Sequence, residues 1–302
     1  LKGDTLINCD SEEEGELFVG CAGGADLNIS VQFKEDTYVP EGDVAVKVNL
    51  TGLKGGHSGV DIHLGRANAN KLMFRFLKEA VRDYGARLSS VDGGSLRNAI
   101  PREAFAVITI PGDNVEALWE FVSDYQEMYR TEYKGIEDNV NFVAEMTDMP
   151  ATLIPEEIQD DLINAIEGCQ NGVISMLADF PGTVESSTNL AIVKSSNGLI
   201  EIQILVRSSS ESRKEAVCSS LESVFALAGA KVEYDGGYGG WQPNIDSPVL
   251  KIMQQAYLDL YGKKPEATVM HAGLECGIIQ EAYPNMDMIS IGPDLQHPHS
   301  PD

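Results

Sequence analysis

Two stretches of the chain share one order of elements, and this repeat constrains the fold more than any other feature. Residues 94–125 and residues 187–229 each open on small polar residues, pass through "NAI" or "NLAI", and continue through a strand pattern into a helix pattern. The second stretch also contains an Asn-Gly pair typical of a hairpin turn. A spacing of about 95 residues is too long for a solenoid unit. The repeat predicts two related α+β lobes side by side, with two unrelated but common β-β-α units as the alternative.

The segments around the first copy alternate strand and helix patterns. Residues 43–50 ("DVAVKVNL") and 104–110 ("AFAVITI") are rich in β-branched and apolar residues and predict strands. Residues 67–85 carry apolar side chains at helical spacing and end on a glycine, which predicts a helix. Residues 113–130 predict a second helix, with Asp113 as its N-cap and an inward face of Val115, Leu118, Trp119, Val122 and Tyr125.

The last quarter of the chain differs from the rest in composition and in its pattern of elements. Residues 234–244 ("YDGGYGGWQPN") combine glycine, proline and aromatic residues and mark a domain boundary. A short helix within residues 270–284 and a buried strand within residues 286–293 would complete an α/β layer. Between them and the boundary, residues 246–265 predict a helix that Ser247 caps, with an apolar face of Val249, Ile252, Met253, Ala256, Tyr257 and Leu260.

Composition excludes several classes of protein. The chain has 302 residues and 43% hydrophobic content, which is enough for a sizeable core and two domains. Its 47 acidic residues against 22 lysines and arginines give a net charge of −25, so phosphate backbones and anionic membranes are poor partners. No segment is apolar enough to span a membrane. The five cysteines form no CxxC pair and no disulfide pattern, which favours a reducing, cytoplasmic setting.

An acidic cluster near the start of the chain allows two interpretations. Four acidic side chains crowd into Asp10–Glu14, within "INCDSEEEGELFVGCAGG". Like charges at such short spacing repel unless water or a cation offsets them. By charge pattern alone a solvated face is the more common outcome, and half of a metal site is the alternative.

Several motifs occur together in one order: "NCDSEEEGE" at 8–16, "GLKGGHSG" at 52–59, "LRNAIPRE" at 96–103, "GWQP" at 240–243, "HAGLECG" at 271–277, and "SIGP" followed by a closing "PHSPD". In this set the chain resembles the aminoacylhistidine (Xaa-His, carnosine-cleaving) dipeptidase branch of the dizinc aminoacylase and carboxypeptidase-like metallopeptidases. The resemblance spans the whole chain. It implies an enzyme that hydrolyses dipeptides with a C-terminal histidine.

The resemblance also implies a division of the chain. A partial α/β catalytic domain, of the phosphorylase/hydrolase-like zinc-peptidase type, would comprise residues 1–24 and 239–302. An α+β lid would be inserted at residues 25–238, with similar lobes at about 42–135 and 136–236. This division agrees with the change of composition at the predicted boundary, residues 234–244, and with the internal repeat.

The family pattern implies two metal ligands in this chain, Asp10 of "NCDSEEEGE" and His299 of "PHSPD". In the family, two Zn²⁺ ions share a bridging carboxylate and an activated water. Carboxylate oxygen and imidazole nitrogen suit zinc, and the dication lowers the pKa of bound water so that hydroxide is available at neutral pH.

The resemblance further assigns three lid residues and two residues of the catalytic domain to catalysis and to substrate. His57, which by itself reads as a turn histidine between glycines, would stabilise the oxyanion on the scissile carbonyl. Arg207, otherwise a surface arginine at a strand end, would bind the terminal carboxylate of the dipeptide. Asn98, otherwise an ordinary turn residue, would contact substrate. Gly273 and Glu275 would hold substrate near a helix start, although Glu275 could equally be a surface acid.

The remaining family residues are not found. His-x-Asp, the bridging Asp and the Glu-Glu pair would precede "NCDSEEEGE", and no His-x-Asp occurs in the 302 residues. We therefore expect a fragment that lacks an N-terminal part and a last segment and is inactive alone.

His63 and His271 are interpreted as structural residues. A non-catalytic lid or assembly module, and a related N-acyl-amino-acid or peptide hydrolase, are alternatives. A homodimer remains compatible with a two-lobed lid.

Overall fold

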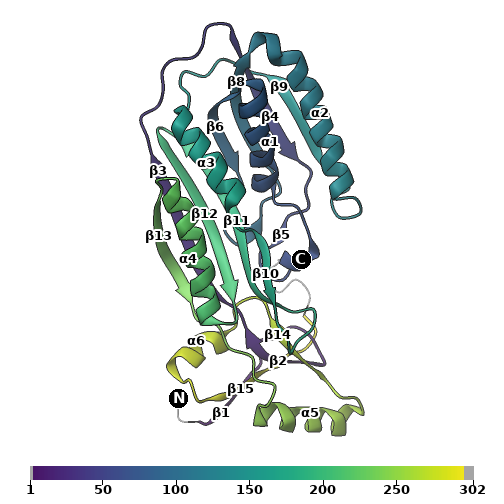
Figure 1. Cartoon of the computed structure of the whole chain (residues 1–302). Helices are drawn as coiled ribbons and strands as arrows, with labels where there is room; N and C mark the ends of the chain where they lie inside the picture. Colours follow the sequence, from purple (N-terminus) through teal and green to yellow (C-terminus); the bar gives the residue numbers. More distant parts are fainter. Residues whose placement is uncertain (1–2, 296–302) are drawn as a thin grey trace.

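The computed structural model describes residues 3–295 and has a mixed α/β fold, as predicted. Its strands form a small sheet and a large sheet at opposite ends of an elongated molecule (Figure 1). The small sheet has the order β1-β15-β2-β14, with bounds β1 (Thr5–Asn8), β15 (Asp287–Ser290), β2 (Glu16–Cys21) and β14 (Glu266–Met270). Two helices accompany it, α5 (Pro248–Tyr261) and α6 (Glu275–Ala282). We call this part the small-sheet region.

The large sheet contains nine strands within the described residues. Along its path the order is β13-β3-β12-β11-β6-β8-β4-β9, and β10 pairs with β11. The bounds are β3 (Gly23–Gln32), β4 (Asp43–Thr51), β6 (Arg87–Gly93), β8 (Ala104–Pro111), β9 (Asn141–Met146), β10 (Gly172–Met176), β11 (Val184–Ser196), β12 (Leu199–Ser208) and β13 (Lys231–Tyr238). Because β11 pairs with β6, strands of both predicted lobes lie in one continuous sheet.

Four helices cover one face of the large sheet (Figure 1): α1 (Ala69–Tyr84), α2 (Val115–Glu132), α3 (Glu156–Gly168) and α4 (Glu211–Leu227). The opposite face, turned away from α1–α4, is termed the open face. A separate two-stranded ribbon pairs β5 (Gly56–His57) with β7 (Ala99–Ile100). Short 3₁₀ turns occupy Ile62–Leu64 and Gly112–Asn114.

Most local predictions are confirmed. The strands at 43–50 and 104–110 are β4 and β8, and the helix at 67–85 is α1, which ends on a left-handed Gly85. The Asn197–Gly198 turn joins β11 to β12, and the hydroxyl of Ser247 caps α5 by accepting from the Leu250 amide. These features were predictable because caps, turns and side-chain periodicity are local properties of the chain.

Two local predictions are wrong. Asp113 does not cap α2, because a 3₁₀ turn precedes the helix and Asn114 is the residue before its first turn. The predicted apolar face of α5 is only partly buried: Val249 packs inward, but Ile252 is 66% exposed and Leu260 is 77% exposed. In the described part of the chain α5 contacts the small sheet along one narrow side, so periodicity alone overstates its burial.

An aromatic cluster anchors the core between α1, α2 and the large sheet. The ring of Phe76 lies 5.1 Å from Phe121, 5.3 Å from Tyr125 and 5.0 Å from Phe142. Phe76 is fully buried. Such offset and edge-to-face contacts stabilise a core beyond the burial of area alone.

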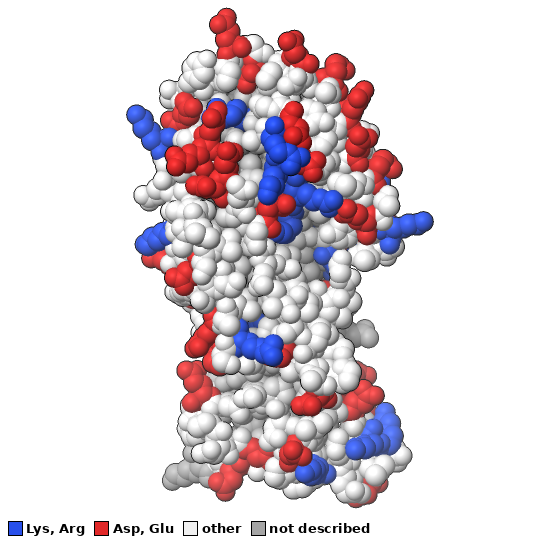
Figure 2. Space-filling view, in the orientation of Figure 1, with Lys and Arg blue, Asp and Glu red and all other residues white. Residues whose placement is uncertain are grey.

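Charge is unevenly distributed over the surface. Figure 2 shows acidic side chains gathered over the end of the molecule that carries the large sheet and again at its foot, with a largely uncharged waist between them. No helix in residues 3–295 combines the length and the apolar character that crossing a bilayer requires.

We expect Phe76→Ala to lower the free energy of unfolding by about 3–5 kcal/mol, because it leaves a cavity at the centre of the aromatic cluster. Urea unfolding followed by circular dichroism would measure the change. Leu227→Ala is the matched control, because Leu227 is 89% exposed at the end of α4. A loss below about 1 kcal/mol for Phe76→Ala would contradict the assigned core.

Candidate functional site

Strand alternation places the candidate site on the open face of the large sheet. In β12, Ile200, Ile202 and Ile204 pack into the core against the helices, so the alternate residues point to the open face. Arg207 belongs to this alternate set and lies at the end of β12 nearest the small-sheet region. The neighbouring strands add Ser187 and Gly24, which are both in register with Arg207.

Arg207 is a buried cation with neutral partners. Arg207 is 5% exposed, and its Nη1 donates a hydrogen bond to the hydroxyl of Tyr238 at 2.7 Å. Nη2 lies 3.5 Å from Oγ of Ser58, and the buried Nε has no hydrogen-bond partner. Among residues 3–295 no carboxylate forms an ion pair with this guanidinium; the nearby Asp26 is paired with Arg97 instead. Burying a charge without an opposite charge is costly, so this position favours an anionic ligand.

The loop that carries His57 lies beside Arg207. The backbone amides of Gly59 and Val60 donate to Nδ1 of His57 at 3.1 and 3.2 Å. A ring nitrogen that accepts two hydrogen bonds carries no proton, so the neutral imidazole holds its proton on Nε2. Burial lowers the pKa of His57, and the charge of Arg207 lowers it further, which favours this neutral form. Within residues 3–295 no hydrogen bond occupies Nε2, so the neutral His57 offers an N–H donor.

Asn98 lies on the segment paired with the His57 loop. Its backbone carbonyl accepts from the Ser58 amide at 2.9 Å, and its side chain is exposed. The buried amide of Asn189, on the open face, donates to the carbonyls of Arg97 and Ala99 on either side of it. The structure thus brings His57, Asn98 and Arg207 to the same end of the large sheet.

A second histidine joins this group from the small-sheet region. His271 follows β14, is 7% exposed, and its Nε2 lies 2.7 Å from Oγ of Ser187. Burial, with the charge of Arg207, lowers the pKa of His271 from 6.5 to about 3. A Cβ at Gly59 would lie 2.2 Å from the His271 carbonyl oxygen, so glycine permits the two regions to touch here. Sequence reasoning left His271 as structural, and only its place in "HAGLECG" could have indicated this contact.

Gly273 and Glu275 lie near the same contact but in different surroundings. A Cβ at Gly273 would lie 2.9 Å from Cε2 of Tyr238, so Gly273 is packed against the tyrosine that holds Arg207. Glu275 is the exposed first residue of α6 and accepts from the Asn8 amide at 3.4 Å. Asn8 ends β1 and also donates to Oγ of Ser290 at the end of β15. Glu275 therefore lies at the edge of the small sheet where these two strands end.

The acidic segment runs beside the last described residues. The Ser11 amide donates to the Ile291 carbonyl at 3.3 Å, and the Leu295 amide donates to the Glu12 carbonyl at 3.0 Å. Asp10 is exposed, and His299 lies outside the described residues. In the described part of the chain no group of three His, Cys, Asp or Glu side chains could hold a metal ion. These residues alone do not make up a metal site.

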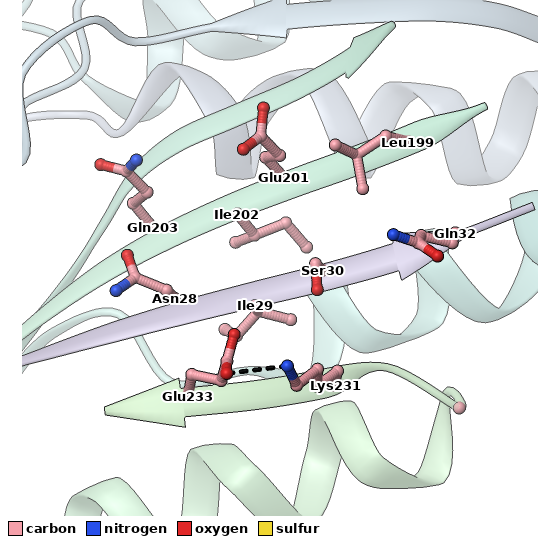
Figure 3. Close-up of a pocket in the computed structure, with 11 residues that line it drawn as sticks. Asn28, Ile29, Ser30, Gln32, Leu199, Glu201, Ile202, Gln203, Lys231 and Glu233 are labelled. Atoms are coloured by element: carbon pink, nitrogen blue, oxygen red, sulfur yellow. Dashed lines mark ion pairs between the residues drawn. The ribbon is translucent and has the colours of Figure 1, made fainter. Parts of the chain in front are cut away.

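A hollow elsewhere on the open face has a different chemistry. It has a volume of about 660 Å³ between β3, β12 and β13, and polar side chains such as Asn28, Glu201 and Gln203 line it (Figure 3). Lys231 and Glu233 form an ion pair within it at 2.7 Å. None of the site residues predicted from sequence lines this hollow, so it is not the candidate site.

Comparisons with known proteins show to which family the chain belongs. Residues 48–137 match the family model of the M20 peptidase dimerisation domain. The cytosol non-specific dipeptidase of Escherichia coli (strain K12) is 43% identical over 302 residues, which are 100% of this chain and 62% of that protein. The crystal structure of aminoacylhistidine dipeptidase from Vibrio alginolyticus matches with a TM-score of 0.95 and 44% identity, covering 100% of this chain and 61% of that chain. The chain belongs to the M20 peptidase family.

Membership of the M20 family confirms the resemblance that the motifs indicated. The matched dimerisation domain runs from β4 to the turn after α2 and contains His57 and Asn98. The chain spans less than two thirds of the length of the two relatives. All five cysteines are free thiols in the structure.

The pKa of His271 predicts a pH dependence of stability. Because the folded pKa of about 3 lies below the unfolded value of 6.5, the unfolded chain binds this proton first as the pH falls. Between pH 7 and pH 5 this histidine should therefore remove about 2 kcal/mol from the free energy of unfolding. We expect His271→Gln to lose correspondingly less over the same interval. Urea titrations at the two pH values would measure both proteins, and equal pH dependence would contradict the prediction.

Proposed function

We propose that the chain is part of a metal-dependent M20 dipeptidase that hydrolyses dipeptides with a C-terminal histidine. The observation that supports this most directly is the buried Arg207, which has no acidic partner among the described residues. The 44% identity to a protein named aminoacylhistidine dipeptidase supports the same substrate class. A dipeptide carries one free carboxylate at a fixed distance from its single peptide bond, so one buried guanidinium can select for length.

Arg207 would bind the terminal carboxylate of the dipeptide. A planar guanidinium donates two parallel hydrogen bonds to a carboxylate, and its present partners are neutral hydroxyls that do not compensate its charge. Asn98, which is bonded to the His57 loop, and Gly273, which packs against Tyr238, would contact the rest of the substrate. Glu275, at the edge of the small sheet, is the least supported of these assignments because its side chain is exposed.

His57 would stabilise the oxyanion that forms on the scissile carbonyl. Its Nδ1 is occupied by two backbone amides, so the proton on Nε2 is available to donate. A donor fixed in this way before the reaction needs no reorganisation in the transition state. Burial, and then the charge of Arg207, lower the pKa of His57 and so favour the neutral ring that this role requires.

Zinc is the proposed metal, with Asp10 and His299 as two of its ligands. Carboxylate and imidazole are ligands that zinc prefers. Bound zinc would supply an activated water at neutral pH. The other ligands and the general base would come from outside the described residues. The hydrogen bonds between residues 11–14 and 291–295 support convergence of the two proposed ligands, because each ligand is a few residues from a bonded segment.

The setting and the assembly are also proposals. The five free cysteines and the cytosol named for the Escherichia coli relative support a cytoplasmic protein. The match to a peptidase dimerisation domain supports a homodimer formed through residues of the large-sheet region. The excess of acidic residues argues against nucleic acid or an anionic membrane as a partner.

The activity can be tested on two forms of the protein: the chain as printed and a form that spans the full length of its relatives. With zinc, we expect the longer form to release histidine from Xaa-His dipeptides, and Asp10→Ala in that form to lose bound metal and rate together. Metal content and histidine release would be measured on the same samples. Cleavage of N-acyl amino acids but not Xaa-His would favour the related hydrolase. Zinc-free, inactive protein in both forms would favour a non-catalytic module.

The assignment of Arg207 can be tested by binding alone. We expect Arg207→Lys to weaken binding of N-acetyl-L-histidine by about tenfold or more, because lysine cannot form the bidentate contact. Binding of N-acetyl-L-histidine amide, which has no carboxylate, should not change. Arg82→Lys is the matched control, since Arg82 is exposed on α1 and paired with Asp83. Isothermal titration would measure all proteins, and equal loss for both ligands would contradict a role in carboxylate recognition.

A further inference from the structure

We propose that Tyr238 is a positioning residue that orients the guanidinium of Arg207 toward the substrate carboxylate. The proposal rests on the function proposed for Arg207. Nothing in the sequence motifs assigns a role to Tyr238, which lies within the glycine-rich "DGGYGGW" segment at the end of β13. Its hydroxyl is the nearest hydrogen-bond partner of Arg207, with a distance of 2.7 Å to Nη1.

The contact depends on a row of three residues across three strands. Gly24 in β3 is in register with Arg207 in β12 on one side and with Tyr238 in β13 on the other. Neighbouring strands lie about 4.8 Å apart, so residues two strands apart are separated by about 10 Å. The Tyr238 hydroxyl can therefore reach the guanidinium of Arg207 only if the tyrosine ring lies across the middle strand. It does so here because the middle residue is a glycine.

Packing on both edges fixes the tyrosine ring. A Cβ at Gly24 would lie 2.5 Å from Cε1 of Tyr238, and a Cβ at Gly273 would lie 2.9 Å from Cε2. Any side chain at either position would therefore displace the ring. Gly24 belongs to the large sheet and Gly273 follows β14 of the small sheet, so the ring is held between the two regions. The orientation of Arg207 is thereby coupled to the contact between them.

The backbone around Tyr238 is also fixed. The pairing of β13 with β3 shifts register between Asp235 and Tyr238, and Gly236 adopts a left-handed conformation with φ of 64°. Such a bulge redirects the side chain that follows it. Nζ of Lys214, in α4, donates to the Tyr238 carbonyl at 3.1 Å and to Glu211 at 2.6 Å. The backbone at the end of β13 therefore holds the Tyr238 hydroxyl in position beside Nη1 of Arg207.

A positioning role differs from simple packing in what the hydroxyl does. With Nε unpartnered and Nη2 at 3.5 Å from Ser58, the Tyr238 hydroxyl provides the one short hydrogen bond that restrains the guanidinium within the described residues. Without it, the fork could rotate about its terminal torsions, and more conformational entropy would be lost when a carboxylate binds. The ring itself would remain in place between its two glycines.

The test removes only the hydroxyl. Tyr238→Phe should weaken binding of N-acetyl-L-histidine by up to about tenfold, which corresponds to the cost of ordering one flexible side chain on binding. Binding of N-acetyl-L-histidine amide should not change. Tyr234→Phe is the matched control, because Tyr234 lies on the same strand but its hydroxyl bonds Glu222 on the surface at 2.6 Å. Isothermal titration would give the affinities, and the ¹⁵N–¹H signal of Arg207 Nε would report the orientation of the guanidinium.

The outcomes separate this inference from the function on which it rests. A selective loss of carboxylate binding in Tyr238→Phe, with a shifted Arg207 Nε signal in the free protein, supports the positioning role. Unchanged carboxylate affinity, or equal loss for acid and amide, overturns it while leaving Arg207 as the carboxylate ligand. If the unaltered protein does not prefer the acid to the amide, the proposed function of Arg207 is wrong and this inference falls with it.

Discussion

The guanidinium of Arg207 is the charge around which the site is organised. It is buried, and its partners in the described residues are two hydroxyls rather than a carboxylate. Removing a cation from water without an opposite charge costs several kcal/mol, and the rest of the fold must supply that energy. The aromatic core beneath the large sheet and the continuous ladder of β3, β12 and β11 provide the rigid support for it.

Burial and the same charge together explain the state of its neighbours. Burial lowers the pKa values of His57 and His271 most, and Arg207 lowers them further because a nearby cation disfavours a second positive charge. Both effects favour neutral rings, and the neutral His57 has a proton that it can donate. A hydroxyl-rich, uncharged lining of Ser58, Ser187 and Tyr238 completes the surroundings. The candidate site thus combines a buried cation, which favours an anionic ligand, with a neutral histidine.

The two regions are in contact through glycine backbone as well as through side chains. Gly59 packs against the carbonyl of His271, Gly273 packs against the ring of Tyr238, and the ring of His271 lies 2.7 Å from Oγ of Ser187. Glycine permits such close approach because it has no Cβ. The candidate site therefore lies where the two sheets meet, a common place for ligand sites in proteins built from two parts. The M20 family membership fits this arrangement, since its dimerisation-domain match lies wholly within the large-sheet region.

The sequence by itself determined the strands at 43–50 and 104–110, the helix at 67–85, the Asn197–Gly198 turn and the Ser247 cap, because each depends on residues close together in the chain. It also determined the family, through motifs long enough to identify, and named Arg207 and His57 as site residues through that resemblance. Burial of α5 and the cap of α2 were predicted wrongly, since both depend on what packs against the helix. Only the tertiary structure decided that Tyr238 and His271 lie beside Arg207. Those contacts follow from strand register and from the meeting of segments 31 and 64 positions away from it, which no local pattern encodes.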